Sequence, residues 1–104
     1  MIPYLINLVP LGQVVDHIVK NKINIRGREK YIEISRMFAD DMQKVDGCVE
    51  ARVLIPLYDY ETVVNYEVWE SKSHYENYDN AMFLKYKKRL KEYFISNVSE
   101  MYYI

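Results

Sequence analysis

The chain has 104 residues, half of them apolar and 28% charged, and its formal net charge is −1. This balance predicts one globular domain with one core. It argues against a disordered chain and against one that binds nucleic acid through a surplus of basic residues. The single cysteine, Cys48, rules out an intrachain disulfide framework and indicates a reducing compartment.

The N-terminal segment is largely apolar, and its two prolines, Pro3 and Pro10, disfavour a helix. We therefore expect residues 1–12 to form an extended arm before a single domain over residues 13–104. The arm has neither the cationic start nor the small-residue cleavage site of a secretory signal, and it is too short to span a bilayer. A cytoplasmic protein without a membrane partner is the expectation.

The first part of the domain predicts a strand followed by a helix. β-branched residues dominate residues 13–25, which indicates a strand that ends at the turn Arg26-Gly27. From Arg28 to Val45 apolar side chains recur at spacings of three and four, which is typical of an amphipathic helix. Gly47 then supplies a residue that can take the left-handed conformation at a helix C-cap.

The middle of the chain predicts two strands. Apolar and polar residues alternate along residues 48–57, and residues 56–61 are typical of a hairpin connection. The following strand, over residues 62–70, has two different faces. One face carries Val64, Tyr66 and Val68, and the other carries Asn65, Glu67 and Trp69.

The last third predicts a broken helix and a final strand. Ser71 and Ser73 are both candidate N-caps of a short helix that ends near residue 78, and Ser73 with Glu76 matches the capping-box pattern. A longer helix is expected over residues 81–94, and a strand over residues 98–104.

This order of elements, β-α-β-β-α-β, predicts an α+β fold of the ferredoxin-like kind, a four-stranded antiparallel sheet with helices on one face. The other face would carry Val64, Tyr66 and Val68, and so would expose an apolar patch. A second copy of the chain, related by a two-fold axis, is the simplest cover for that patch. We therefore expect a homodimer that forms through the open sheet face.

Several short motifs resemble the antibiotic biosynthesis monooxygenase family. They are Arg26-Gly27, the stretch Val45-Asp46-Gly47-Cys48, the stretch Tyr66-Glu67-Val68-Trp69-Glu70-Ser71, and Phe83 in the following helix. Many members have proline where Arg26 stands. The resemblance covers about Val14 to Ile104, and it implies a dimeric α+β barrel in which two sheets pack face to face.

The resemblance also implies a set of catalytic residues. Asn65 and Trp69, Tyr75 six residues later, and Arg89 in the closing helix are similar to the Asn, Trp, Tyr and Arg that line the pocket of quinone-forming members. These members oxidise phenolic or polycyclic aromatic molecules with O₂, without a metal or a cofactor. Arg89 would supply positive charge, Asn65 and the Trp69 indole N–H would be fixed donors, and Tyr75 would donate a hydrogen bond or shuttle a proton.

Other interpretations remain open at this point. Trp69 and Tyr75 are also typical core residues, and Arg89 lies among lysines that indicate an exposed helix face. A non-catalytic dimeric module that binds a small aromatic, or only assembles, is the main alternative. The second alternative is the haem-degrading branch of the family. It uses a histidine in the last helix, where residues 84–88 have none, and His17 and His74 lie elsewhere.

Overall fold

The computed structural model describes residues 13–104, so the predicted N-terminal arm lies outside the described residues. The elements are β1 (Val15–Ile23), the single 3-10 turn η2 (Ile25–Gly27), α1 (Arg28–Met42), β2 (Cys48–Leu54), β3 (Thr62–Trp69), α2 (Lys72–Asn77), α3 (Ala81–Lys91) and β4 (Phe94–Tyr103). None of the helices in residues 13–104 is long and apolar enough to cross a membrane.

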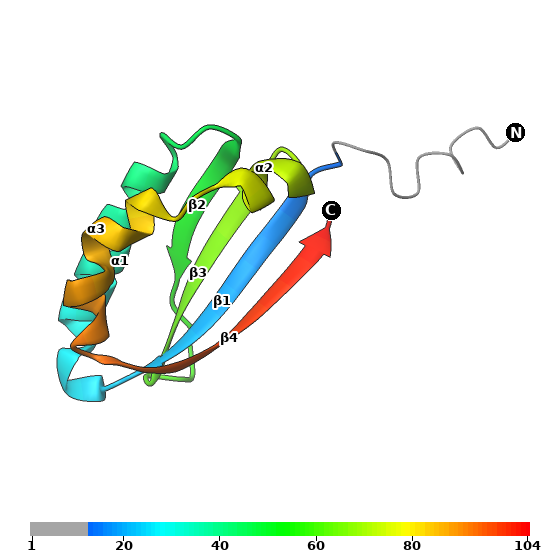
Figure 1. Cartoon of the computed structure of the whole chain (residues 1–104). Coiled ribbons are helices and arrows are strands. Elements are labelled where there is room, and N and C mark those ends of the chain that lie inside the picture. The colour runs from blue at the N-terminus through cyan, green and yellow to red at the C-terminus, as the bar shows by residue number, and fades with distance from the viewer. Residues whose placement is uncertain (1–12) are drawn as a thin grey trace, which may run out of the picture.

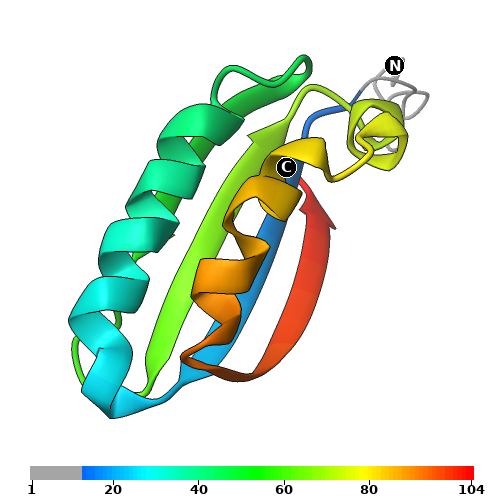
Figure 2. The ribbon, with the colours of Figure 1, turned by 60° about the vertical axis from the view of Figure 1, so that its left-hand side comes forward.

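The four strands form one sheet in the order β2-β3-β1-β4, and every pair of neighbours is antiparallel. The helices cover one face of this sheet (Figure 1). Helix α1 packs against β2, and α3 lies beside α1 (Figure 2). This is the ferredoxin-like α+β arrangement, so the predicted fold is confirmed.

The apolar stripe of α1 is also confirmed, because Tyr31, Ile34, Phe38 and Met42 are all buried. The helix ends at Met42, three residues before the predicted end. Gly47 is therefore not its C-cap. The glycine has a φ of 86° in the turn before β2, and a Cβ there would lie 2.6 Å from the Cβ of His74.

The C-terminal part differs most from the prediction. Helix α3 ends at Lys91 and β4 already begins at Phe94, four residues before the strand predicted from residue 98. The carbonyl of Tyr93 accepts from the N–H of Asn24, which starts the pairing of this segment with β1. The Tyr93 ring occupies the space above Gly27, where a Cβ would lie 1.9 Å from the ring.

Two local details of the middle segments also differ. Ser71 alone caps α2, because its hydroxyl accepts from the N–H of His74, and Ser73 lies inside the helix. In β2 the register shifts between Cys48 and Glu50, so Val49 is an extra, exposed residue in a bulge. From Glu50 onward the predicted alternation of the two faces holds.

Candidate functional site

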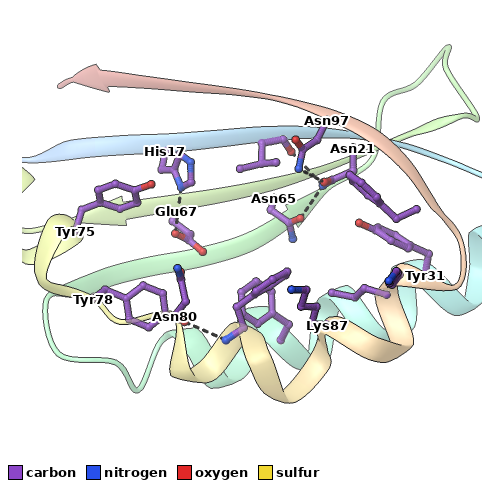
Figure 3. A pocket seen from close by; sticks show the side chains of 16 residues that line it. His17, Asn21, Tyr31, Asn65, Glu67, Tyr75, Tyr78, Asn80, Lys87 and Asn97 are labelled. Atoms are coloured by element: carbon purple, nitrogen blue, oxygen red, sulfur yellow. Dashed lines mark hydrogen bonds and ion pairs between the residues drawn. The ribbon is translucent and has the colours of Figure 1, made fainter.

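A pocket of about 480 Å³ lies between the helices and the sheet (Figure 3). Its lining comes from β1, β3, β4, α1 and α3 and from the segment around α2. Most of the wall is apolar, formed by side chains such as Val19, Phe38, Phe83, Leu90 and Phe94. Such a pocket suits a planar apolar ligand whose orientation is set by a few polar groups.

Three asparagines form a hydrogen-bonded amide cluster at one end of the pocket (Figure 3). Asn21 of β1 donates through Nδ2 to Oδ1 of Asn65 on β3 at 2.8 Å, and to the carbonyl of Val63 at 3.0 Å. Asn97 of β4 donates to Oδ1 of Asn21 at a longer distance of 3.5 Å. Since Oδ1 of Asn65 is an acceptor here, its Nδ2 is left to donate to a ligand.

The other end of the pocket contains an acid–imidazole pair, Glu67 and His17. These residues are directly opposite each other on β3 and β1. Oε1 of Glu67 lies 3.6 Å from Nδ1 of His17, and both side chains are largely buried. Oε1 also accepts from the indole N–H of Trp69 at 3.0 Å. The far nitrogen of His17, Nε2, lies 2.7 Å from Oγ of Ser99 on the edge strand β4.

Aromatic rings enclose this acid–imidazole pair. The Tyr75 ring contacts His17 edge-on, with ring centroids 4.9 Å apart, and it contacts Trp69 at 5.8 Å. Tyr78 also packs against Trp69, with ring centroids 5.5 Å apart. Burial raises the pKa of both tyrosine hydroxyls, and the charge of Glu67 raises it further. Both hydroxyls are therefore held in the neutral form that donates hydrogen bonds.

Arg89 lies apart from this pocket. Its guanidinium is exposed and lies over the ring of Tyr86, 4.9 Å from the ring centroid. The hydroxyl of Tyr86 in turn donates to Asp41, which links α3 to α1. The cations that line the pocket are Lys87 and Lys91, one on each side of Arg89 in the sequence.

The structure therefore brings together three of the four predicted site residues. Asn65 and Tyr75 line the pocket, and Trp69 lies directly behind it, fully buried. Sequence reasoning did not assign the amide Asn21 or the cations Lys87 and Lys91 to the site. For Asn21 a signal existed: it shares the helix-facing side of β1 with His17, at a spacing of four residues.

No cluster of metal-ligating side chains occurs within residues 13–104. The α3 side chains that line the pocket, Phe83, Lys87, Leu90 and Lys91, include no histidine. A haem held by a histidine of this helix therefore has no ligand on Ala81–Lys91.

One sequence family and several solved structures are similar to this chain. A family model described as antibiotic biosynthesis monooxygenase matches residues 17–89 of the 104. No curated protein sequence matches significantly. A structure from Nitrosomonas europaea, provisionally named an antibiotic biosynthesis monooxygenase, is similar with a TM-score of 0.81. It is 17% identical over 93% of this chain and 95% of that one.

Two further structures have the same fold. A Bacteroides thetaiotaomicron protein of unknown function, described as a possible oxidoreductase, has a TM-score of 0.78 at 18% identity, over 89% of this chain and 99% of that one. SnoaB, a cofactor-independent oxygenase from Streptomyces nogalater solved as an asparagine-to-alanine variant, has a TM-score of 0.75. It is 12% identical over 88% of this chain and 93% of that one. At these identities the likeness shows the fold.

Proposed function

We propose, from the premise that this chain belongs to the antibiotic biosynthesis monooxygenase family, that it is a cofactor-independent monooxygenase that converts a phenolic or polycyclic aromatic molecule into a quinone. The observation on which this depends most is the mainly apolar pocket of about 480 Å³ that contains Asn65 and Tyr75, with Trp69 directly behind it. The fold shared with the oxygenase SnoaB agrees with this proposal.

The shape and lining of the pocket favour a planar substrate. Its volume lies within the range of pockets that enclose drug-sized ligands. Phe38, Phe83 and Phe94 offer apolar surface for fused rings. The Asn65 amide is available to a carbonyl or hydroxyl oxygen at the edge of such a ring system, and so it would set the orientation of the substrate.

The chemistry requires the substrate itself to reduce O₂. A ring methylene loses two hydrogens and becomes a carbonyl, one oxygen atom enters the product, and the other leaves as water. The anion of a hydroxyanthrone gives an electron to O₂ much more readily than the neutral molecule does. Lys87 and Lys91 would stabilise this anion electrostatically, in the role that the family resemblance implies for Arg89.

We also propose that the protein is a homodimer through the outer face of the sheet, the face that the helices leave bare (Figure 1). In register order this face presents Leu54, Val64, Lys20 and Val98 side by side across the four strands. Oδ1 of Asp16 on the same face is shielded from solvent and has no hydrogen-bond partner within residues 13–104. Val64 and Val68, which the sequence predicts to be exposed on this face, are already buried in the single subunit, whereas Leu54 and Val98 are exposed. A second copy would cover Leu54 and Val98 and could bring a donor to Asp16.

The test is O₂ consumption by the purified protein with dithranol, a dihydroxyanthrone. We expect turnover to a quinone without added metal, flavin or haem. Asn65→Ala should abolish most of this turnover while the protein remains folded and dimeric. Binding of dithranol without O₂ consumption would instead favour the non-catalytic binding module, and an absence of both across a panel of phenols would overturn the proposal.

A further inference from the structure

Glu67 and His17 form an acid–imidazole pair that has no assigned role in the proposed oxidation. Glu67 lines the pocket and lies opposite His17 on the neighbouring strand, and His17 reaches Ser99 on the exposed edge strand. The three side chains thus run from the pocket across the sheet toward solvent. We propose that Glu67 is the general base that deprotonates the substrate, and that His17 and Ser99 conduct the proton to solvent.

The two oxygens of Glu67 have different environments. Oε1 accepts the indole N–H of Trp69 at 3.0 Å and lies 3.6 Å from Nδ1 of His17. Oε2 has no hydrogen bond to any group within residues 13–104, and the carboxylate projects into the pocket (Figure 3). Oε2 is not one of the solvent-shielded side-chain atoms without a partner in this part of the chain, so a ligand in the pocket can reach it. The substrate proton is the group that Oε2 is placed to accept.

The proton transfers balance without an added reagent. The C–H bond of a ring methylene breaks, its electron pair moves into the ring system toward the carbonyl oxygen, and the proton bonds to Oε2 of Glu67. The carboxyl group passes the proton to Nδ1 of His17, and Nε2 of His17 releases its own proton to Oγ of Ser99. The exposed Ser99 hydroxyl releases its own proton to solvent water at the same time, so that it stays neutral. The gap of 3.6 Å between Glu67 and His17 needs to close by only about half an ångström, which is typical of catalytic contacts before substrate binds.

The surroundings hold this pair in place. Tyr75 packs edge-on against the imidazole of His17, and the Trp69 N–H fixes the carboxylate of Glu67. The side chains of His17 and Glu67 are only 14% and 12% exposed, whereas Ser99 is exposed on the edge strand. The gradient of exposure gives the proton an exit while the pocket end stays shielded from water, which favours proton transfer over quenching of the carbanion.

A second histidine–glutamate pair provides a matched control. Nε2 of His74 lies 3.2 Å from Glu70, so this pair has a shorter contact than the first. Both of its side chains are much more exposed, and neither residue lines the pocket. Changes at His74 and Glu70 therefore remove the same chemical groups without touching the proposed relay.

This inference rests on the proposed function for its substrate class, and the test separates the two. Without oxygen and in D₂O, a base in the pocket should catalyse exchange of the methylene hydrogens of dithranol for deuterium, which NMR follows directly. We expect exchange by the wild type well above that in buffer. The exchange rate with Glu67→Gln should be at least about a hundredfold lower than with the wild type. His17→Gln should lose less, and Ser99→Ala least.

The controls Glu70→Gln and His74→Gln should exchange like the wild type. Circular dichroism checks the fold of each variant, and Glu67→Ala, which also removes the carboxylate, gives a second variant if Glu67→Gln does not fold. Exchange that survives in both Glu67 variants, or a wild type that catalyses no exchange, would overturn the relay. Exchange without O₂ consumption under air would support the relay and overturn the monooxygenase. A loss of deuterium exchange in Ser99→Ala that is as severe as in Glu67→Gln would also contradict the relay.

Discussion

Asn21 and Asn65 share a hydrogen bond of 2.8 Å between neighbouring strands, at the end of the pocket where the amide cluster lies. Only Asn21 is fully buried, and it also donates to the carbonyl of Val63. The two asparagines therefore have different roles. Asn21 satisfies buried groups of the sheet, whereas Asn65 has a donor left for a ligand.

The first prediction follows from this difference. Asn21→Ala removes the donor to Val63 and should lower the free energy of unfolding by about 1–3 kcal/mol. Asn65→Ala leaves the bond from Asn21 to Val63 in place, so it should change stability by less than about 1 kcal/mol while weakening dithranol binding. Urea denaturation and ligand titration of both variants check this. Equal effects of the two substitutions on stability would contradict it.

A second prediction concerns Trp69, whose indole is fully buried and donates to Glu67. Trp69→Phe removes the donor to a charged acceptor and also leaves unfilled volume, so it should destabilise the fold by about 2–4 kcal/mol. O₂ consumption should fall as well, because Glu67 loses the group that orients it. Glu67→Gln keeps an acceptor oxygen for the indole and should destabilise the fold less, as measured in the same denaturation series. A larger loss of unfolding free energy in Glu67→Gln than in Trp69→Phe would show that the hydrogen bond from the indole to Glu67 is not the main stabilising contact of these two residues.

The third prediction distinguishes the cations of α3. Arg89 lies over Tyr86 outside the pocket, whereas Lys87 lines it. Lys87→Ala should raise the dissociation constant of an anionic hydroxyanthrone several-fold, since one charge near a partly shielded anion contributes about 1 kcal/mol. Arg89→Ala should leave this constant nearly unchanged. A higher dissociation constant for Arg89→Ala and an unchanged one for Lys87→Ala would show that Arg89 stabilises the anion, as the family resemblance implies.

The fold could be predicted from the sequence because its signals are local and repeated. The apolar stripe of Tyr31, Ile34 and Phe38 identifies α1, and the alternation along residues 62–69 identifies β3 and the direction of each side chain. The boundaries that failed depend on contacts between distant segments. Residues 94–97 look like a helix end in isolation, but pairing with β1 makes them a strand.

The site was predictable only in part, for a related reason. Asn65, Trp69 and Tyr75 lie within eleven residues of sequence and form one recognisable pattern. Their partners on β1, His17 and Asn21, lie more than forty residues away and come close only through the strand register. The orientation of Arg89 depends on which side of α3 faces α1, which the lysine-rich sequence does not decide.

The fourth prediction concerns stability at high pH. Burial raises the pKa of the Tyr31 hydroxyl from 10.0 to about 12. The folded state thus favours the neutral phenol, so the stabilisation is fully present below the unfolded pKa and is lost as the pH rises through about 12. Two pKa units correspond to at most about 3 kcal/mol. Tyr31→Phe should therefore lose less stability than the wild type as the pH rises from about 10 to about 12.

Urea denaturation of both proteins at pH about 8 and about 12 measures the difference. Burial also raises the pKa of the Cys48 thiol to about 11, but both proteins contain this group, so its contribution is common to them. An alkaline loss of stability that is identical in the two proteins would show that Tyr31 does not ionise on unfolding in this interval.

The last prediction tests the dimer through a matched pair of exposed apolar residues. Val98 is 62% exposed on the outer face of the sheet, and Leu84 is 60% exposed on α3. An aspartate at either position is tolerated by a single subunit, because both side chains reach solvent there. At an interface, however, the charge of Val98→Asp would be buried without a partner, and sedimentation should show at least a tenfold weaker dimer. Leu84→Asp should associate like the wild type. A wild-type chain that sediments as a single subunit at micromolar concentration would rule out this packing, because the apolar outer face would then be stable in water.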